Sequence, residues 1–404
     1  AQRGACLLIS GKVRKNMEFV VFAGVLLLLF IFMIVQELIQ TKNQEKLFKK
    51  YLRENYGKEP PKEYSLERFA RLGSYLERHK EEKQLDDITW NDLGMDEVFR
   101  RIDRTYSAAG EEYLYYTLRN ISCGREALEH LEEVVNWLQE QENIKVRIQL
   151  LMKRLGHLGK YSLYDYLDNL DYLGERSNRK IVLGNLLYLP FLLLLFVQPA
   201  MGTIGIVLCM LWHIMTYFRE KKVIEPYIIS FAYVLRLIDV CEELEKQKIP
   251  VYRRELDELR EVLKSLRELR RGAYWVMAGN QGKIGGNPLD ILADYLRMIL
   301  HLDIFQFNRM LEKLRKKTGQ VETMLAITGY LDMAISVGGF RKSLEGYCIP
   351  KLEEDTEKAF LHMKKGWHPL LSQPVKNSIR ADRGILLTGS NASGKSTFLK
   401  MVAV

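Results

Sequence analysis

The sequence predicts a mainly α-helical protein with transmembrane helices, one N-terminal and one helical hairpin, and a truncated α/β domain at the C-terminus. Residues 19–35 and 181–218 contain no Asp, Glu, Lys or Arg, and these two runs predict the transmembrane helices. A short apolar run at 385–387, followed by a loop with two glycines, predicts the strand and turn that open an α/β domain. Between these landmarks the apolar residues mostly follow helical spacing.

The composition is compatible with two or three domains that have cores of their own, since 47% of the 404 residues are hydrophobic. A formal charge of +9, from 60 basic and 51 acidic residues, fits anionic partners such as nucleic acid or lipid headgroups. The 5 cysteines are scattered without a C-x-x-C pair, and no H-E-x-x-H occurs. A disulfide framework or a zinc site is therefore not indicated, and a reduced, cytosol-facing protein is expected.

The N-terminal part divides into a lead (1–18), a transmembrane anchor (19–39) and a charged linker (40–84). Met17 precedes the apolar run and is the expected natural start. The uncharged 17 residues would span about 26 Å as a helix, close to the hydrocarbon thickness of a bilayer. A cleaved signal peptide is the rival interpretation, but its apolar core is usually shorter and no small-residue cleavage site follows. Four lysines that come after the run place its C-terminal side in the cytoplasm.

Residues 181–218 predict a hairpin of two spanning helices. As one helix these 38 residues would measure about 57 Å, which is too long for a single crossing. Gln198 to Gly202, with a proline at 199, is the expected turn. Basic residues flank both ends and place them in the cytoplasm: Arg176, Arg179, Lys180, Arg219, Lys221 and Lys222. The alternative is a buried hairpin in a soluble core; the favoured localisation is a multi-pass membrane protein whose soluble domains lie in the cytoplasm.

Two stretches on either side of the hairpin, residues 85–180 and 219–365, are predicted to be a helical core in two parts. Apolar residues recur at 114, 118 and 121, and Gly110 would permit close packing or a turn. In the second part, helices are expected at 224–245, 289–307 and 311–337, with a glycine-rich loop or hinge at 279–288. Leu256, Leu259, Leu263 and Leu266 form a short apolar seam amid interleaved charges, which favours a solvated helical face over a DNA-binding patch.

The most informative motif is G-x-x-x-x-G-K-[ST] at residues 389–396, with a predicted helix start at 397–404. The glycines let the loop curl so that backbone N–H groups face inward, and a helix N-terminus adds partial positive charge where phosphates sit. Lys395 is expected to reach the β- and γ-phosphates of ATP, and the Ser396 hydroxyl to ligate Mg²⁺. The predicted nucleotide-binding residues are Gly389, Ser390, Asn391, Ala392, Ser393, Gly394, Lys395, Ser396 and Thr397. Residues 366–404 are thus the expected start of a P-loop domain.

Several stretches together resemble the MutS family of DNA mismatch-repair ATPases. The run containing Phe99, Asp103, Thr105, Gly110 and Leu114 is similar to the start of that family's helical core. The segment Leu331-Asp332-Met333-Ala334-Ile335-Ser336 resembles the segment that closes it, and Gly366-Trp367-His368-Pro369-Leu370-Leu371 resembles the beginning of its ATPase domain. The resemblance covers about residues 85–404 without the hairpin. It implies ATP binding and hydrolysis at a dimer interface, coupled to helical arms that clamp duplex DNA.

Departures from the family pattern leave alternatives open. Ser390 and Ala392 stand where the family usually has Pro and Met, and no aromatic residue occurs near Pro374 to Asn377, where the family tends to carry one against adenine. The loop also resembles that of ABC transporter ATPases. An ABC-type transporter is therefore one alternative, and a membrane scaffold switched by nucleotide is another.

The sequence thus predicts a membrane-anchored, MutS-like protein that binds ATP, double-stranded DNA and membrane lipid and forms a homodimer in its full-length parent. The carboxylates needed for hydrolysis are expected beyond Val404, so the parent is the expected ATPase and this chain is expected to bind phosphates only. Mismatch specificity is doubted, because residues 1–84 leave no room for a mismatch-reading domain. The chain's one Phe-x-Glu match, Phe218-Arg219-Glu220, lies at the edge of the hairpin.

Overall fold

The computed structural model describes residues 31–36, 39–58, 64, 66–81, 83–121, 124–158, 162–267, 295–353, 360–390 and 393–404. The chain forms two compact units, one of residues 1–55 with 285–291 and the other of residues 56–284 with 292–404. In the first unit, residues 31–36 and 39–55 are helical. The predicted lead (1–18), most of the anchor (19–39) and the predicted loop 279–288 lie outside the described residues.

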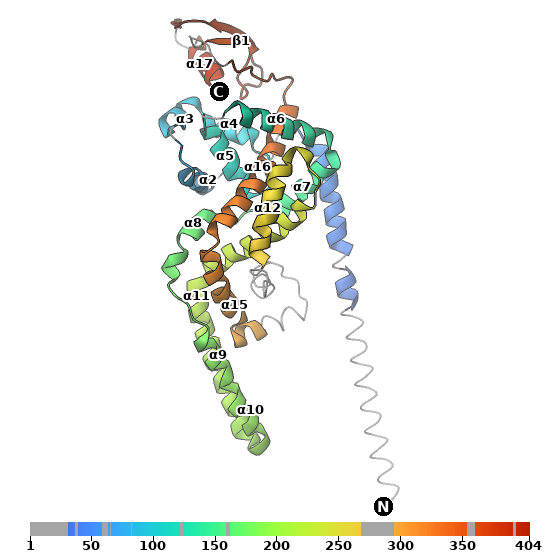
Figure 1. The fold of residues 1–404 in the computed structure, drawn as a ribbon, viewed down its shortest axis with the longest axis vertical. Coiled ribbons are helices and arrows are strands. Elements are labelled where there is room, and N and C mark those ends of the chain that lie inside the picture. Colours follow the sequence, from blue (N-terminus) through green and yellow to red (C-terminus); the bar gives the residue numbers. More distant parts are fainter. Residues whose placement is uncertain are drawn as a thin grey trace, which may run out of the picture. The chain divides into compact units, whose positions relative to one another are not determined.

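The second unit is mostly helical, as the sequence predicts, with one two-stranded sheet (Figure 1). Its elements are α2 (Leu66–Arg78), α3 (Asp87–Leu93), α4 (Met95–Ile102), α5 (Ala108–Arg119), α6 (Arg125–Glu140), α7 (Glu142–Leu155), α8 (Leu163–Asp168), η1 (Leu170–Leu173), α9 (Arg179–Leu186), α10 (Tyr188–Val197), α11 (Pro199–Glu245), η2 (Pro250–Tyr252), α12 (Arg253–Leu266), α15 (Leu302–Arg315), α16 (Thr318–Lys342), β1 (Leu361–Gly366), β2 (Asn377–Ala381) and α17 (Lys395–Ala403).

Helix α16 is the central element of the core. It packs against α4, α5, α6, α7, α11 and α12. Its buried residues lie on all sides of the helix, from Val321 through Leu331 to Ile335, so its apolar character reflects burial inside the protein. The break between α15 and α16 falls at Lys316 and Lys317, several residues later than the break predicted between 307 and 311.

The contact between α5 and α16 is close because glycines lie at the crossing. A Cβ atom built on Gly110 would stand 2.4 Å from Oδ2 of Asp332, and one built on Gly329 would stand 2.6 Å from the carbonyl oxygen of Ala109. Both distances are well below van der Waals contact, so a methyl group at either position would push the helices apart. The close packing that the sequence suggested for Gly110 is confirmed.

Residues 181–218 form the predicted helical hairpin, with two differences from the prediction. The turn consists of Gln198 alone, because Pro199 already occupies the first turn of α11, where a proline costs no hydrogen bond. In addition, the predicted helix at 224–245 is no separate element, since α11 continues from the hairpin turn into the core over 47 residues. Pro226 lies inside this continuous helix.

Three helices among the described residues are long and apolar enough to cross a membrane by length and composition: the combined stretch Arg179–Val197, Pro199–Glu245 and Thr318–Lys342. Their most apolar windows differ in surroundings, with 6% and 22% buried for the two hairpin helices but 72% for α16. The two hairpin helices therefore expose their apolar side chains, whereas α16 covers its own with other helices.

The C-terminal part holds the only described strands. β1 and β2 pair antiparallel, with Leu361 opposite Ala381 and Met363 opposite Ile379, and a bulge interrupts the register before Gly366. The strand predicted at 385–387 does not form. Ile385 and Leu386 are 54% and 88% exposed, and no described strand lies beside them to accept their backbone hydrogen bonds. Described residues therefore do not include the strand that should precede the predicted phosphate loop.

The glycine crossing makes a prediction about stability. Gly329→Ala should lower the free energy of unfolding by about 2 kcal/mol, because the added methyl group meets the backbone of Ala109, which cannot move without displacing α5. Gly319→Ala is the matched control on the same helix. Nothing lies within 4 Å of its Cβ position, so this substitution should be neutral or stabilise by up to ~1 kcal/mol. Denaturant unfolding of the detergent-solubilised chain measures the change in the free energy of unfolding for both variants. Equal changes would contradict the close contact between α5 and α16 at Gly329.

Candidate functional site

The predicted phosphate loop leads directly into the last helix. Gly394 has φ 84°, a left-handed conformation that glycine adopts without steric cost, and α17 begins at the next residue. The N–H of Phe398 donates to the carbonyl oxygen of Gly394 at 2.9 Å, which closes the first turn. The positive end of α17 therefore lies at the loop, as the motif requires.

Lys395 folds back over the loop that precedes it. Its Nζ donates to the carbonyl oxygen of Gly389 at 2.6 Å and to that of Ser390 at 2.5 Å. The backbone N–H of Ser393 donates to the same Ser390 carbonyl at 3.3 Å. The ammonium group thus connects the start of α17 to the beginning of the loop.

The remaining predicted site residues take up the start of the helix. Ser396 and Thr397 are the second and third residues of α17, and both are exposed. An exposed hydroxyl one residue after the lysine suits a Mg²⁺ ligand, because hard cations prefer oxygen donors. Asn391 and Ala392 lie outside the described residues. The structure therefore brings Gly389, Ser390 and the stretch 393–397 together.

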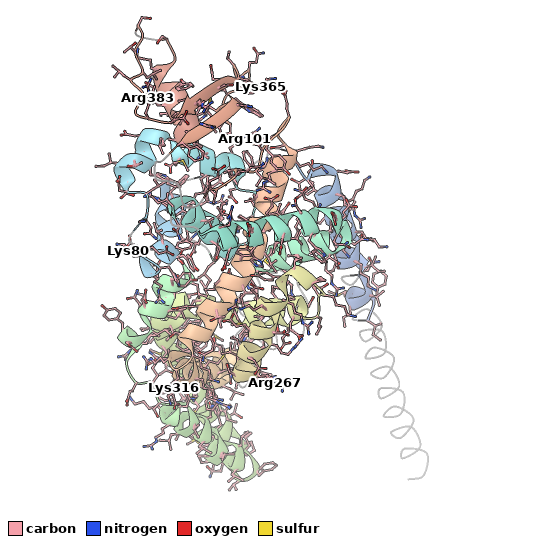
Figure 2. All side chains as sticks on the ribbon, turned by 45° about the horizontal axis from the view of Figure 1, so that its top comes forward. Lys80, Arg101, Arg267, Lys316, Lys365 and Arg383 are labelled. Carbon is pink, nitrogen blue, oxygen red and sulfur yellow. The ribbon has the colours of Figure 1, made fainter. Side chains whose placement is uncertain are left out.

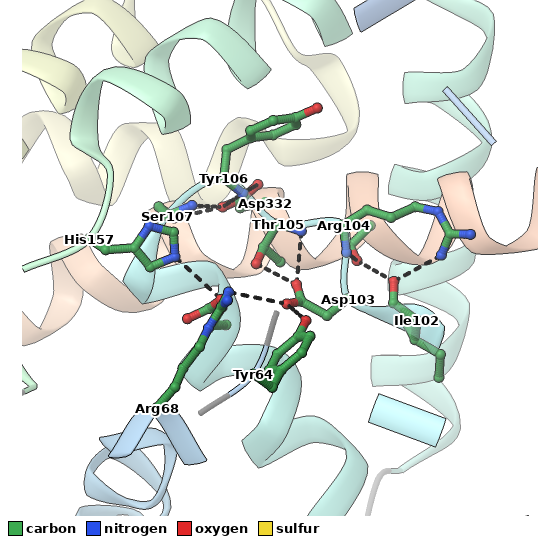
Figure 3. A network of polar contacts seen from close by, with 12 residues as sticks. Tyr64, Arg68, Ile102, Asp103, Arg104, Thr105, Tyr106, Ser107, His157 and Asp332 are labelled. Atoms are coloured by element: carbon green, nitrogen blue, oxygen red, sulfur yellow. Dashed lines mark hydrogen bonds and ion pairs between the residues drawn. The ribbon is translucent and has the colours of Figure 1, made fainter. Parts of the chain in front are cut away.

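A second cluster of polar groups joins the two core segments that carry the MutS resemblance (Figure 3). The Asp332 carboxylate on α16 accepts hydrogen bonds from the N–H of Tyr106 at 3.0 Å and of Ser107 at 2.8 Å, and from the Ser107 hydroxyl at 2.6 Å. Four residues further along α16, Ser336 accepts from the N–H of Arg104 at 2.7 Å and donates to the Ile102 carbonyl at 2.8 Å. We call this cluster the core joint.

The turn at residues 103–107, which contacts α16, is stabilised by hydrogen bonds of its own side chains. Asp103 accepts from the N–H of Thr105 at 2.9 Å and from its hydroxyl at 2.6 Å, and it also accepts from the Tyr64 hydroxyl. Ser107 caps α5 by accepting from the N–H of Gly110 at 3.1 Å. Asp103, Thr105, Ser107 and Asp332 are at most 1% exposed. In a dry setting these paired polar groups define one arrangement of the turn against α16.

Two acidic residues buried on α5 were not singled out by the sequence analysis. Glu111 forms ion pairs with Arg68 and Arg71 of α2, and His157 lies 3.3 Å from its carboxylate. Glu112 accepts from the Ser162 hydroxyl at 3.0 Å, and burial raises its pKa to about 8. The signal that could have found them is two adjacent carboxylates inside an otherwise apolar helical pattern. They tie α5 to α2 and to the start of α8.

Basic side chains, the groups expected to meet DNA phosphates, come from many segments (Figure 2). The labelled examples are Lys80, Arg101, Arg267, Lys316, Lys365 and Arg383. The predicted solvated face of α12 is confirmed, since Arg260 pairs with Glu245 and Asp257 and Lys264 pairs with Glu261. The Phe-x-Glu match is not arranged as a wedge, because Glu220 pairs with Arg176 at the foot of the hairpin.

Comparison with known proteins gives a partial match. The chain is 28% identical to MutS protein homolog 4 from Homo sapiens and 29% identical to MutS protein homolog 4 from Mus musculus, each over 117 residues. The aligned stretch is 27% of this chain and 12% of the relative, so the chain spans a small part of the curated relatives it matches. No protein-family model matches. These matches support a local MutS-like relationship.

The raised pKa of Glu112 predicts a pH-dependent stability. In the unfolded chain the carboxyl ionises near its usual pKa of 4.5, whereas in the folded protein it stays protonated up to pH about 8. The buried Glu112 is therefore least costly to folding below pH 4.5, where it is protonated in both states. The free energy of unfolding then decreases progressively as the pH rises from 4.5 to about 8, and above that pH the decrease is complete. Relative to Glu112→Gln, the native protein should lose a few kcal/mol, on the order of 1.4 per pKa unit, between pH 5 and 8.

Thermal melts of both forms across this pH range measure the effect. Glu129→Gln on α6 is the control, because its side chain is 68% exposed and should leave the pH profile of the native protein unchanged. Parallel profiles for the native protein and Glu112→Gln would show that Glu112 is ionised in the folded state.

Proposed function

We propose that this chain is a membrane-anchored, MutS-like protein whose 389–397 loop binds the phosphates of ATP with Mg²⁺ and whose helical core contacts duplex DNA. The observation that carries the nucleotide site is the position of Lys395, whose ammonium lies over the loop carbonyls at the first residue of α17. Local similarity to MutS protein homolog 4 supports the family-level part of the proposal.

In the proposed nucleotide complex, Lys395 exchanges its carbonyl partners for phosphate oxygens. The two carbonyl contacts are neutral acceptors, whereas β- and γ-phosphate oxygens carry full negative charge and form stronger, charge-assisted hydrogen bonds. The N–H groups of the first turn of α17 face the same position and add to the attraction. Bound Mg²⁺ would neutralise phosphate charge, and the exposed Ser396 hydroxyl is the residue to hold it.

Membrane anchoring is proposed because the paired hairpin helices leave their apolar side chains exposed. Gly202 and Gly205 let α11 approach α10 closely, since a Cβ on them would stand 2.6 Å from the backbone of Leu195 and 2.0 Å from the ring of Phe191. The apolar side chains consequently point outward, with Leu193 69% and Phe196 89% exposed. An apolar surface of this extent on paired helices is stable in lipid, where all backbone groups are satisfied within the helices.

A transport function receives less support from the same helices. Of the three candidate spans, α16 is largely enclosed by other helices of the core. Of these three spans, only the two hairpin helices then present exposed apolar faces that lipid can contact. The apolar residues at 31–35, in the predicted anchor, are exposed as well. A hairpin anchors a soluble core without enclosing a path for a substrate, so anchoring is favoured over an ABC-type transporter.

The nucleotide site is tested by Lys395→Ala. Removal of the ammonium should weaken binding of a fluorescent ATP analogue at least tenfold, or about 1.4 kcal/mol, in the presence of Mg²⁺. Lys400→Ala is the matched control, because it removes the same charge from the same helix but lies more than one turn beyond the loop. Titration of the detergent-solubilised chain measures both; equal affinity of the Lys395→Ala variant and the native chain rules out the proposed role.

DNA contact is tested by salt and by mispairs. Phosphate contacts release counterions, so affinity for a duplex should fall roughly 10³-fold between 50 and 200 mM salt. Matched and mismatched duplexes should bind within tenfold of each other, since Phe218-Arg219-Glu220 lies at the foot of the hairpin with its glutamate paired. Fluorescence anisotropy at the two salt concentrations measures both ratios. A preference for the mispair above tenfold, or salt-independent binding, would contradict this mode of contact.

A further inference from the structure

The two helices of the hairpin change from apolar to basic at the same depth. Arg179 begins α9 and lies 19 residues before the Gln198 turn, and Arg219 lies 21 residues after it on α11. At 1.5 Å per residue both are about 30 Å from the turn, which is the thickness of a bilayer's hydrocarbon core. Lys180 and Lys222 lie within one turn of these arginines. We call Arg179, Lys180, Arg219 and Lys222 the basic collar.

The collar is exposed and not used by the fold. All four side chains are exposed, and among the described residues no ion pair engages them. Their basic neighbours behave differently. Arg176 pairs with Glu220 and donates to Asn308 at 3.1 Å, and Lys221 donates to the Tyr217 hydroxyl at 3.0 Å.

The internal contacts of these neighbours fix the foot of the hairpin against α15. The Tyr217 hydroxyl donates to Asp303 at 2.8 Å, and the Asn185 side chain donates to the carbonyl oxygen of Leu300 at 3.1 Å. The collar therefore lies where the hairpin is fixed to the core by hydrogen bonds, and its four basic side chains are exposed.

Each side of the collar continues an outward-facing apolar stripe. On α11, Trp212 and Met215 are 50% and 73% exposed, and Arg219 and Lys222 follow them at spacings of seven residues, which place them on the same face. On α9, Leu183 and Leu186 are 65% and 50% exposed, and Arg179 precedes them by four and seven residues. The outer surface therefore passes from hydrocarbon-compatible to cationic within one helical turn on both helices.

We propose that the basic collar binds the phosphate headgroups of anionic phospholipids in the cytoplasmic leaflet. The inference rests on the proposed membrane anchoring and adds a lipid preference to it. Duplex DNA would supply the charge but not the apolar partner that the adjoining stripes require, whereas an anionic lipid supplies both in one molecule. Each cation near an anionic surface attracts anionic headgroups, so four of them enrich such lipids around the hairpin.

Trp212 provides a reporter inside the structure. It is half exposed on the lipid-facing stripe, two turns from Arg219. Bromine atoms on acyl chains quench tryptophan fluorescence on contact, so they report which lipid touches it. The full chain is reconstituted in phosphatidylcholine vesicles with a minor fraction of phosphatidylglycerol, and the bromines are placed on one lipid or the other. Trp212→Phe identifies the part of the quenching that comes from this residue.

For the native chain, brominated phosphatidylglycerol should quench Trp212 roughly threefold more than its mole fraction predicts. Replacing all four collar residues by Gln should reduce quenching to the mole-fraction value. The matched control is Lys246→Gln, Lys248→Gln, Arg253→Gln and Arg254→Gln, which removes the same charge from exposed positions at the other end of α11 and the start of α12, and it should retain the enrichment.

The outcomes separate the inference from the anchoring on which it rests. Extraction of the chain by alkaline carbonate would refute membrane anchoring, and with it the proposed binding of anionic lipids by the collar. Retention in the membrane with quenching at the mole-fraction value, or with enrichment that persists in the collar variant, would refute the collar alone. A collar variant that keeps its lipid enrichment but loses affinity for duplex DNA would assign these cations to nucleic acid instead. Retention with enrichment that only the collar variant loses supports the inference.

Discussion

The rest of the core depends on the hydrogen bonds between the Asp332 carboxylate and the turn at Tyr106 and Ser107. A buried carboxylate is stable only when hydrogen bonds replace its lost hydration, and here two backbone N–H groups and the Ser107 hydroxyl do so. These donors come from a turn 225 residues away in sequence. The chain between the two segments, including the hairpin, must therefore leave the core and return to it. The fold is organised by this closure.

Close approach of α5 and α16 is what lets so short a side chain reach the turn. Gly110 and Gly329 remove the Cβ atoms that would separate the helices, and the turn at 103–107 then lies within hydrogen-bond range of α16. Glu111 and Glu112 extend the same principle on α5, because their ion pairs and hydrogen bonds attach α2 and the region of Ser162 to the helix that α16 holds. Packing and polar bonding thus support each other: neither the glycines nor the carboxylates alone would fix the joint.

Much of this could be predicted from the sequence, and the misses have physical reasons. Charge-free runs predict the hairpin well, but the cluster of charges at 219–222 indicated a helix boundary where α11 in fact continues. Charged residues mark a change from apolar to polar surroundings. A helix can continue across that change because its backbone hydrogen bonds are made within the helix. An apolar run such as 385–387 predicts a strand, yet a strand needs a partner for its backbone groups, and a one-dimensional pattern does not reveal whether that partner lies alongside.

The candidate site shows the same division between spacing and environment. The motif spacing predicts a phosphate loop with its glycines, Lys395 and Ser396, because such a loop is a local structure formed by consecutive residues. It did not identify the carbonyl oxygens that Lys395 engages or the buried pair on α5, because burial depends on segments that are distant in sequence. Contacts between neighbouring residues are therefore easier to predict from the sequence than those of a polar interior that joins distant segments.

Continuity of α11 gives the proposed anchor a mechanical meaning. A loop between membrane and core would let the two move independently. Here one helix carries the exposed apolar stripe at Trp212, half of the basic collar and the buried residues from Phe231 to Leu244. These last residues pack against α7, α12 and α16. A tilt of the hairpin therefore reaches α16 through side-chain packing, except where Pro226, which lacks a backbone N–H, permits a bend just past the collar. In the proposed function, α11 thus connects the membrane hairpin to the helix that carries the core joint, and Pro226 is the position at which α11 can bend.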